Sequence, residues 1–147
     1  MAMNLIVGQS GGPTAVINSS LAGVYETAKN LGVNKVYGML YGIEGLLQEK
    51  MVDLDDMLGD IMSIELLKRT PSSYLGSCRC KLPTPEQDES VYDTLFRLFD
   101  KYEIGALLYI GGNDSMDTIA KLSAYGARIR SKVRFIGVPK TIDNDLM

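Results

Sequence analysis

Polar and charged side chains gather in a segment near the end of the chain, directly after an apolar run. The segment reads Pro139-Lys140-Thr141-Ile142-Asp143-Asn144-Asp145 and packs a lysine, a hydroxyl and two carboxylates into six residues. A carboxylate can accept a hydroxyl proton while a lysine neutralises phosphoryl charge, so this set is suited to phosphoryl transfer. Taken alone, the segment has a solvated turn rich in Asx residues as its less favoured interpretation.

Two glycine pairs also stand between an apolar run and a helix-like pattern. Their segments are Ser10-Gly11-Gly12-Pro13-Thr14 and Gly111-Gly112-Asn113-Asp114-Ser115. A glycine pair lets the backbone approach an oligophosphate, and the N–H groups of the helix start that follows point at its negative charge. Each pair would serve as well for a tight turn, and neither fits the GxGxxG or P-loop pattern.

A further loop segment, residues 72–81, carries Arg79 and Lys81 and has no helical or strand period. An arginine beside small residues is suited to clamp a phosphate, although an exposed loop arginine is the simpler interpretation. Cys78 and Cys80 are too close in sequence for an easy disulfide and too few for a zinc site. We expect both to be reduced thiols.

The composition excludes several classes of protein. Histidine is absent, so Ser-His-Asp triads, Cys-His pairs and His-based zinc motifs cannot form within this chain. The net charge of -3 offers no positive field to a nucleic acid. No apolar run approaches the ~18 residues of a membrane span. The sequence therefore predicts a cytoplasmic protein without nucleic-acid or membrane partners.

The candidate segments must be positioned by the apolar elements around them. Four apolar runs predict strands, near residues 4–7, 35–40, 106–110 and 133–138. Helical spacing or start signals predict four helices, which follow Thr14, span 53–68, begin at Thr84-Pro85-Glu86-Gln87 and span about 115–125. The third helix is expected to bury a stripe of Val91, Leu95, Leu98 and Tyr102.

Continuous apolar strands that alternate with helices indicate an α/β fold. We predict a three-layer α/β/α domain with a mainly parallel, Rossmann-like sheet. Ligands of such sheets bind outside the carboxyl ends of the strands, which is where the polar segments leave.

Taken in order, the four segments resemble the phosphofructokinase family. The matching residues are Ser10-Gly11-Gly12, Gly76-Ser77-Cys78-Arg79, Gly111-Gly112-Asn113-Asp114-Ser115 and Pro139-Lys140-Thr141-Ile142-Asp143-Asn144-Asp145. The resemblance spans the chain and implies that residues 1–147 are the N-terminal donor-binding domain, without the sugar-phosphate-binding remainder. It implies phosphoryl transfer to the 1-hydroxyl of fructose 6-phosphate, giving fructose 1,6-bisphosphate in glycolysis, by a cytoplasmic homo-oligomer.

The resemblance also implies a role for each matching residue. Asp143 matches the proton acceptor, Thr141 contacts the sugar phosphate beside it, and Lys140 stabilises the transferred phosphoryl group. The donor phosphates would be bound by Gly11, Gly12, Arg79, Gly112, Asn113, Asp114 and Ser115. The implied cofactor is Mg²⁺, supported indirectly by Asp145. Asn113 replaces the family's usual aspartate at the metal position, and an amide oxygen is a weaker ligand than a carboxylate.

Asp114 bears on the identity of the phosphoryl donor. ATP-using bacterial members of the family usually have glycine there, and a carboxylate would crowd and repel the α-phosphate of a nucleotide. They also commonly have glycine at the position of Lys140, where pyrophosphate-using members carry lysine. The prediction is therefore a pyrophosphate-dependent phosphotransferase. The alternatives are an ATP-dependent phosphofructokinase and, for these residues in isolation, a non-catalytic phosphate-binding fragment.

Overall fold

The computed structural model describes residues 3–9, 15–58, 75 and 81–139, with residues 15–19 described by their backbone alone. The described residues form a five-stranded sheet in the order β3-β2-β1-β4-β5. The strands are β1 (Asn4–Gln9), β2 (Lys35–Met39), β3 (Met51–Asp53), β4 (Ile104–Gly111) and β5 (Arg134–Pro139). Every pairing is parallel except β2 with β3. The predicted mainly parallel sheet is confirmed.

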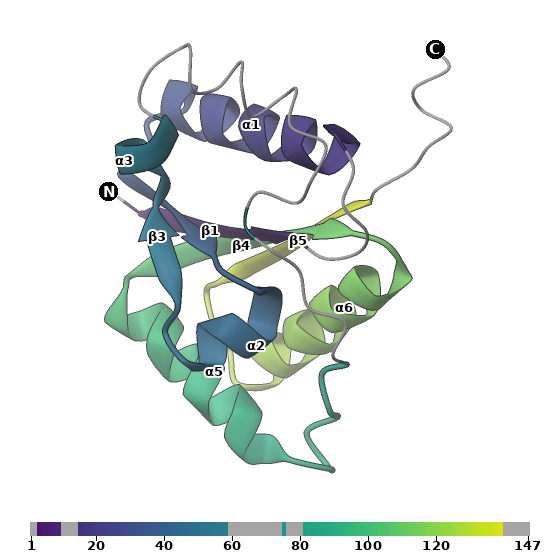
Figure 1. Cartoon of the computed structure of the whole chain (residues 1–147). Helices are drawn as coiled ribbons and strands as arrows, with labels where there is room; N and C mark the ends of the chain where they lie inside the picture. Colours follow the sequence, from purple (N-terminus) through teal and green to yellow (C-terminus); the bar gives the residue numbers. More distant parts are fainter. Residues whose placement is uncertain (1–2, 10–14, 59–74, 76–80, 140–147) are drawn as a thin grey trace.

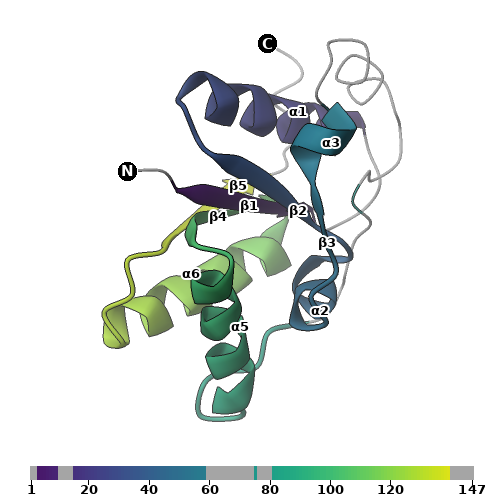
Figure 2. The same cartoon turned by 90° about the vertical axis from the view of Figure 1, so that its left-hand side faces the viewer.

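Helices cover both faces of this sheet (Figures 1 and 2). On one face lie α1 (Ala15–Asn30) and α3 (Leu54–Leu58). On the other face lie α2 (Gly42–Leu47), α5 (Glu89–Lys101) and α6 (Asn113–Arg128). The three-layer α/β/α arrangement expected from the sequence is therefore present.

The apolar strand residues supply a core on each side of the sheet. Ile6 packs into the cluster under α5 and α6, whereas its neighbours Leu5 and Val7 pack into the cluster under α1. Successive side chains of a strand point to opposite faces, so a continuous apolar run is buried from both sides. This is why β1, which is buried along its whole length, shows no polar alternation.

The helix predicted to begin with Thr84 as its cap and Pro85 as its first residue begins four residues later, at Glu89, which corrects that prediction. Thr84 N–H donates to Gln87 Oε1 at 2.9 Å and Gln87 N–H donates to Thr84 Oγ1 at 3.3 Å, so the expected capping bonds close a separate turn. Asp88, with an extended backbone at φ -160° and ψ 91°, then caps α5 by accepting from Ser90 N–H. Thr84 and Gln87 therefore form the predicted capping hydrogen bonds, but the helix itself is capped by Asp88, a residue type that is more favourable than threonine at this position.

The buried stripe of α5 is wider than predicted. Leu95 and Leu98 are buried as expected, whereas Val91 and Tyr102 are half-buried. The fully packed residues are Tyr92, Leu95, Phe96, Leu98 and Phe99. This helix packs against α2 and α6 as well as β4, so it buries a broad face, and the aromatic residues beside the predicted stripe fill it.

Two short elements, α2 and β3, were not predicted, because six and three residues are too few to show a period. The helix predicted over 53–68 is helical at Leu54–Leu58, whereas Asp53 is the last residue of β3, and residues 59–68 lie outside the described residues. The helix predicted over about 115–125 is longer and spans Asn113–Arg128. In the part of the chain that the structure describes, no helix has the length and apolar character needed to cross a membrane.

Candidate functional site

The carboxyl ends of three neighbouring strands meet at one edge of the sheet. Gln9, the last residue of β1, pairs with Ile110 of β4, and Gly111 pairs with Pro139, the last residue of β5. Both glycine segments and the lysine–aspartate segment therefore leave adjacent parallel strands at the same edge. The strand arrangement thus brings together the starting points of three segments that are distant in sequence.

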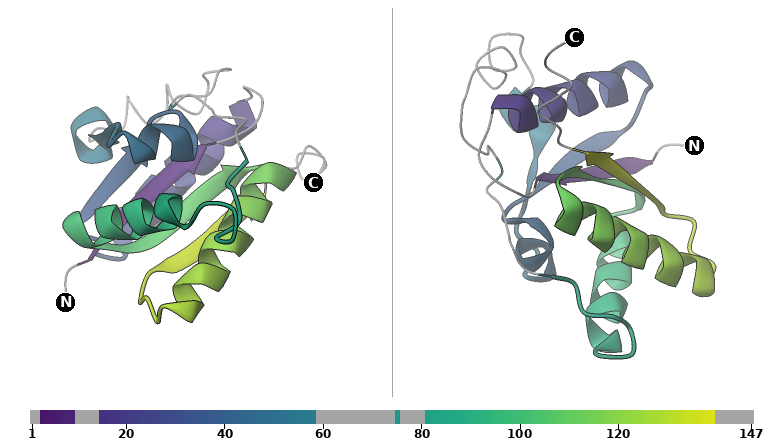
Figure 3. Two further views of the ribbon diagram at one scale, coloured as in Figure 1. Left: turned by 90° about the horizontal axis from the view of Figure 1, so that it is seen from below. Right: turned by 90° about the vertical axis from the view of Figure 1, so that its right-hand side faces the viewer.

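This edge includes the point at which the chain order of the sheet reverses. From β1 the chain passes through α1 to β2 on one side, and from β4 it passes through α6 to β5 on the other. Figure 3 shows α1 and α6 on opposite faces. Ligands of open α/β sheets bind in the crevice at such a switch point. Both helices begin beside it, and a helix N-terminus favours negative charge.

The start of α6 is open to a ligand. Gly112 is the N-cap, and among the described residues no side chain caps the first turn. A Cβ placed on Gly112 would meet no heavy atom within 4 Å. Gly112, Asn113 and Asp114 are all exposed. Backbone N–H groups in the first turn of a helix have no intrahelical partner, so they remain available to an anion.

Ser115 lies one step further into α6 and is only 1% exposed. Its Oγ has no hydrogen-bond partner in the described structure. Leaving a buried hydroxyl unsatisfied costs about 1–3 kcal/mol, so native proteins rarely do so without reason. A hydroxyl of this kind at an open helix start is suited to a phosphate oxygen.

Sequence reasoning missed a hydrogen-bonded cluster at the ends of β1 and β2. Gln9 is fully buried, and its Oε1 accepts a 2.7 Å hydrogen bond from Leu75 N–H. The Leu75 carbonyl in turn accepts from Tyr41 N–H at 2.9 Å. The sequence held one signal: Gln9 is a polar residue that ends an otherwise apolar run.

The remaining predicted site residues fall outside the described part of the chain. They are Gly11, Gly12, Arg79, Lys140, Thr141, Asp143 and Asp145, together with Cys78 and Cys80. Their roles stay predictions. Within the ranges that the structure describes, no group of three or more His, Cys, Asp or Glu side chains could hold a metal ion.

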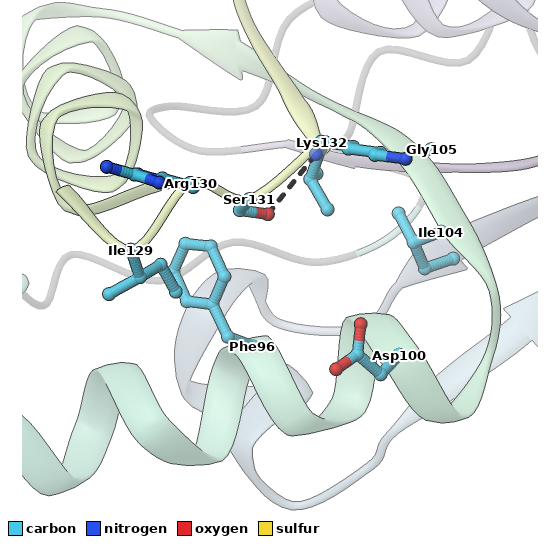
Figure 4. Close-up of a pocket in the computed structure, with 9 residues that line it drawn as sticks. Phe96, Asp100, Ile104, Gly105, Ile129, Arg130, Ser131 and Lys132 are labelled. Atoms are coloured by element: carbon cyan, nitrogen blue, oxygen red, sulfur yellow. Dashed lines mark hydrogen bonds between the residues drawn. The ribbon is translucent and has the colours of Figure 1, made fainter. Parts of the chain in front are cut away.

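Two cavities lie away from the carboxyl edge. One, of about 380 Å³, is lined by the beginning of β4 and by residues 129–133 ahead of β5, and so marks the opposite, amino edge. In Figure 4, Asp100 of α5 faces the turn that carries Ser131 across this cavity. The other, of about 450 Å³, is lined by apolar residues of α1, β4 and β5. Neither cavity is lined by residues 112–115.

Comparison with known proteins identifies the family. The phosphofructokinase family model matches residues 4–147. A pyrophosphate–fructose 6-phosphate 1-phosphotransferase of Rhodospirillum rubrum is 42% identical over 144 residues, covering 97% of this chain and 34% of the relative. A sulfofructose kinase of Alkalicoccus urumqiensis is 33% identical over 144 residues, covering 98% and 35%.

A solved structure agrees with these relatives. The crystal structure of a pyrophosphate-dependent phosphofructokinase from Nitrosospira multiformis superposes with a TM-score of 0.87 at 38% identity, covering 98% of this chain and 35% of that one. The chain thus spans about a third of the length of the proteins it matches. With the family model matching nearly every residue, the chain belongs to the phosphofructokinase family.

Proposed function

We propose that residues 1–147 are the donor-binding part of a phosphotransferase that moves a phosphoryl group from pyrophosphate to the 1-hydroxyl of fructose 6-phosphate. The observation that carries the proposal is the open start of α6, with an exposed carboxylate at Asp114 beside an uncapped first turn. Support also comes from relatives about 40% identical that are named as pyrophosphate-dependent enzymes.

The charge and the size of the Asp114 side chain favour pyrophosphate over ATP as the phosphoryl donor. Its carboxylate stands on the second residue of α6, next to the backbone N–H groups that would receive the donor's phosphates. A nucleotide would have to carry its α-phosphate and ribose past this carboxylate, whereas pyrophosphate has no such extension. A single repulsive group of this kind can set specificity.

The transfer itself would use the segment after β5. Asp143 accepts the proton of the 1-hydroxyl while that oxygen forms its bond to phosphorus, and the bridging P–O bond of pyrophosphate breaks to release phosphate. Lys140 neutralises charge on the transferred group, and Thr141 holds the sugar phosphate. Catalysis then rests on positioning and charge neutralisation, as in other phosphoryl transfers.

Mg²⁺ fits the described residues only as a partly coordinated ion. Asn113 would offer one amide oxygen, a weaker ligand than a carboxylate, at the start of α6, and the described residues hold no group of three or more His, Cys, Asp or Glu side chains around it. We propose that pyrophosphate and water oxygens complete the coordination, with Asp145 supporting it indirectly. The ion would neutralise donor charge.

The proposal extends to a glycolytic role, a cytoplasmic location and a homo-oligomeric parent enzyme, each on the strength of the family. Sedimentation of the purified full-length enzyme would test the assembly.

A chimera tests the proposed function. Residues 4–147 would replace the matching segment of the Rhodospirillum rubrum relative, and turnover would be followed with pyrophosphate and with ATP. We expect a clear preference for pyrophosphate in kcat/KM, which Asp114→Gly narrows or reverses. As the control for authentic turnover, Asp143→Asn should lower kcat by about 10²-fold or more. Efficient use of ATP with little use of pyrophosphate would show that the donor is wrongly assigned.

Substitution of Lys140 in the same chimera tests whether this residue stabilises charge during the transfer. Because its proposed contact is to charge that develops during transfer, Lys140→Gly should lower kcat with pyrophosphate more than it raises KM. A change confined to KM would contradict this role and leave Lys140 as a simple binding residue.

A second candidate concerns these residues by themselves. The chain spans about a third of the length of its relatives, which favours a non-catalytic phosphate-binding module when it is isolated. The identity of the phosphoryl acceptor can be tested in the same chimera, because the chain is also similar to a sulfofructose kinase. The chimera should therefore be assayed with fructose 6-phosphate and with its sulfo analogue.

A further inference from the structure

Gly137 lies in the middle of β5 although the backbone there does not require a glycine. The pairing of β5 with β4 stays in register through this position, so no bulge explains it. Among the described residues the glycines with a positive φ are Gly32 and Gly42, so Gly137 does not serve a left-handed conformation either. Glycine weakens the interior of a strand and often marks a close approach by another part of the protein. The reason for Gly137 therefore lies in what packs on it.

Met116 of α6 occupies the space that a side chain at position 137 would fill. A Cβ on Gly137 would lie 2.6 Å from Met116 Sδ and 2.9 Å from Met116 Cε. Carbon atoms in favourable contact stand about 3.5–4.0 Å apart, so a side chain at this position would displace the thioether. Gly137 thus provides a hole on the strand for a side chain of the helix.

A second contact of the opposite sense lies near the other end of α6, which packs along β5 (Figure 3). Here the small residue is on the helix, and a Cβ on Gly126 would lie 3.2 Å from Phe135 Cε2. Phe135 and Gly137 are two residues apart, so they face the same side of β5. The two contacts together fix the helix on the strand, because a shift along β5 would bring Met116 or Gly126 against a neighbour that does not fit.

Met116 also belongs to the first turn of α6, the turn proposed to bind the donor. Its N–H donates to the carbonyl of the N-cap Gly112 at 3.1 Å. Ser115, whose buried Oγ has no partner among the described residues, directly precedes it. Ahead of the N-cap, Gly111 pairs with Pro139 of β5. The strand β5 therefore holds the start of α6 on both sides of the N-cap.

We propose that Gly137 is a positioning residue of the donor site, which admits Met116 and so sets how closely the first turn of α6 lies on the sheet. Gly137 touches neither donor nor acceptor in this role. The inference rests on the proposed function for its ligand, pyrophosphate, which the N–H groups of this turn and Ser115 would bind. A bulkier residue at position 137 would lift Met116 and move these groups away from the phosphate.

The test uses Gly137→Val, because valine suits a strand and its branched side chain fills the space of the Met116 thioether. Alanine would be a weaker test, since the flexible end of Met116 could turn aside. Pyrophosphate affinity of the folded 147-residue chain should fall by about tenfold or more, because small displacements of binding groups cost that much. Without ligand, hydrogen exchange of the Met116 N–H should be faster, because a lifted turn weakens its bond to Gly112.

Met116→Ala supplies the rescue. In Gly137→Val/Met116→Ala the thioether is gone and the valine has room, so most of the lost affinity and the slow exchange at position 116 should return. Met116→Ala by itself leaves a gap without a clash and should weaken binding less than Gly137→Val does. If Gly137→Val does not fold, Met116→Ala still tests the contact, and affinity and exchange equal to wild type would then overturn the inference.

The matched control is Gly126→Ala, which crowds Phe135 in the second contact between the same helix and strand. It lies more than three helical turns from the donor-binding turn, so affinity and Met116 exchange should stay near wild type whatever its effect on stability. If wild type binds pyrophosphate and Gly137→Val binds it equally, or if Met116→Ala gives no rescue, the inference is overturned and the proposed function stands. An equal loss of affinity in Gly126→Ala would overturn it as well. If wild type binds no pyrophosphate, the proposed function fails and the donor role of Gly137 fails with it.

Discussion

Ser115 shows at the level of one residue how a binding site can oppose stability. Its buried Oγ lacks a partner among the described residues, although the open first turn of α6 lies beside it. A buried hydroxyl without a partner destabilises a protein, and a phosphate oxygen bound at this helix start would supply the missing hydrogen bond. Unsatisfied polar groups therefore mark candidate sites more sharply than sequence pattern does.

We expect Ser115→Ala to raise the free energy of unfolding by up to about 1 kcal/mol, because it removes a buried hydroxyl without a partner. The same change should weaken pyrophosphate binding by about tenfold, the value of one hydrogen bond to a charged group. Urea denaturation and titration calorimetry measure the two effects. Ser123→Ala, at an exposed position of the same helix, is the control and should change neither. A loss of stability in Ser115→Ala would contradict the interpretation.

The sequence predicted candidate residues where chemistry follows directly from local order. Gly112 to Ser115 could be named because a glycine pair follows an apolar run and precedes a helix. The contact between Leu75 and Gln9 could not, since this hydrogen bond joins residues 66 positions apart. Only the folded sheet brings them together, and neither residue type indicates a partner.

Helix α2 shows how an element with poor intrinsic propensity is fixed by its surroundings. It contains Gly42 and Gly45, and its first residue follows Tyr41, whose N–H donates to the Leu75 carbonyl. A Cβ on Gly45 would lie 1.6 Å from the carbonyl oxygen of Leu40, so backbone packs directly against this glycine. The low helix propensity of glycine disfavours a helix here, and tertiary contacts stabilise the helix nevertheless.

Two helical glycines should consequently respond in opposite ways to alanine. Gly45→Ala must displace backbone and should cost about 3 kcal/mol or more. Gly23→Ala in α1 meets nothing within 4 Å and should stabilise by about 0.5–1 kcal/mol, because alanine loses less backbone entropy. Chemical denaturation followed by circular dichroism measures both. Similar effects of the two substitutions would show that Gly45 is not so tightly packed.

An exposed ion pair ties the turn after α2 to the end of α5. Glu49 Oε2 lies 2.9 Å from Lys101 Nζ and accepts a 2.7 Å hydrogen bond from Tyr102. These contacts, chiefly the hydrogen bond from Lys101, lower the pKa of Glu49 below its ordinary 4.5. A lowered folded-state pKa means that the contribution to stability is present above 4.5 and lost as the pH falls through the folded value.

Glu49→Gln should therefore be less stable than wild type at pH 7, with the difference shrinking as the pH is lowered below 4.5. Urea midpoints at pH 7 and near pH 3 measure this change. Glu103→Gln, an exposed carboxylate that also has a positive φ, is the control. If the difference in stability between Glu49→Gln and wild type stays constant with pH, the charge of Glu49 does not cause that difference.

For the whole molecule, the sequence predicted the mainly parallel architecture because β1, β2, β4 and β5 each contain an apolar run and because helices connect β1 to β2 and β4 to β5. The sequence did not predict the order of the strands in the sheet, since the choice of neighbours for β1 depends on which face of the sheet each helix covers. Among the described residues, part of one face of the sheet is left uncovered beside α1, where Leu31 is 78% and Ile136 is 45% exposed at the apolar cavity. Parallel sheets are ordinarily covered on both faces, so the described elements leave β5 less buried than the other parallel strands.

The uncovered part of the sheet and the small share of the relatives' length that the chain covers both bear on whether the 147-residue chain can catalyse the transfer alone. The chain spans about a third of the length of its relatives, and phosphoryl transfer requires donor and acceptor to be held together. We expect the 147-residue chain to bind pyrophosphate without detectable turnover, whereas the chimera that carries residues 4–147 turns over. A coupled assay for fructose 1,6-bisphosphate distinguishes them, and Asp143→Asn in the isolated chain controls for a contaminating enzyme. Turnover by the isolated chain that is lost in Asp143→Asn would show instead that these residues position both substrates.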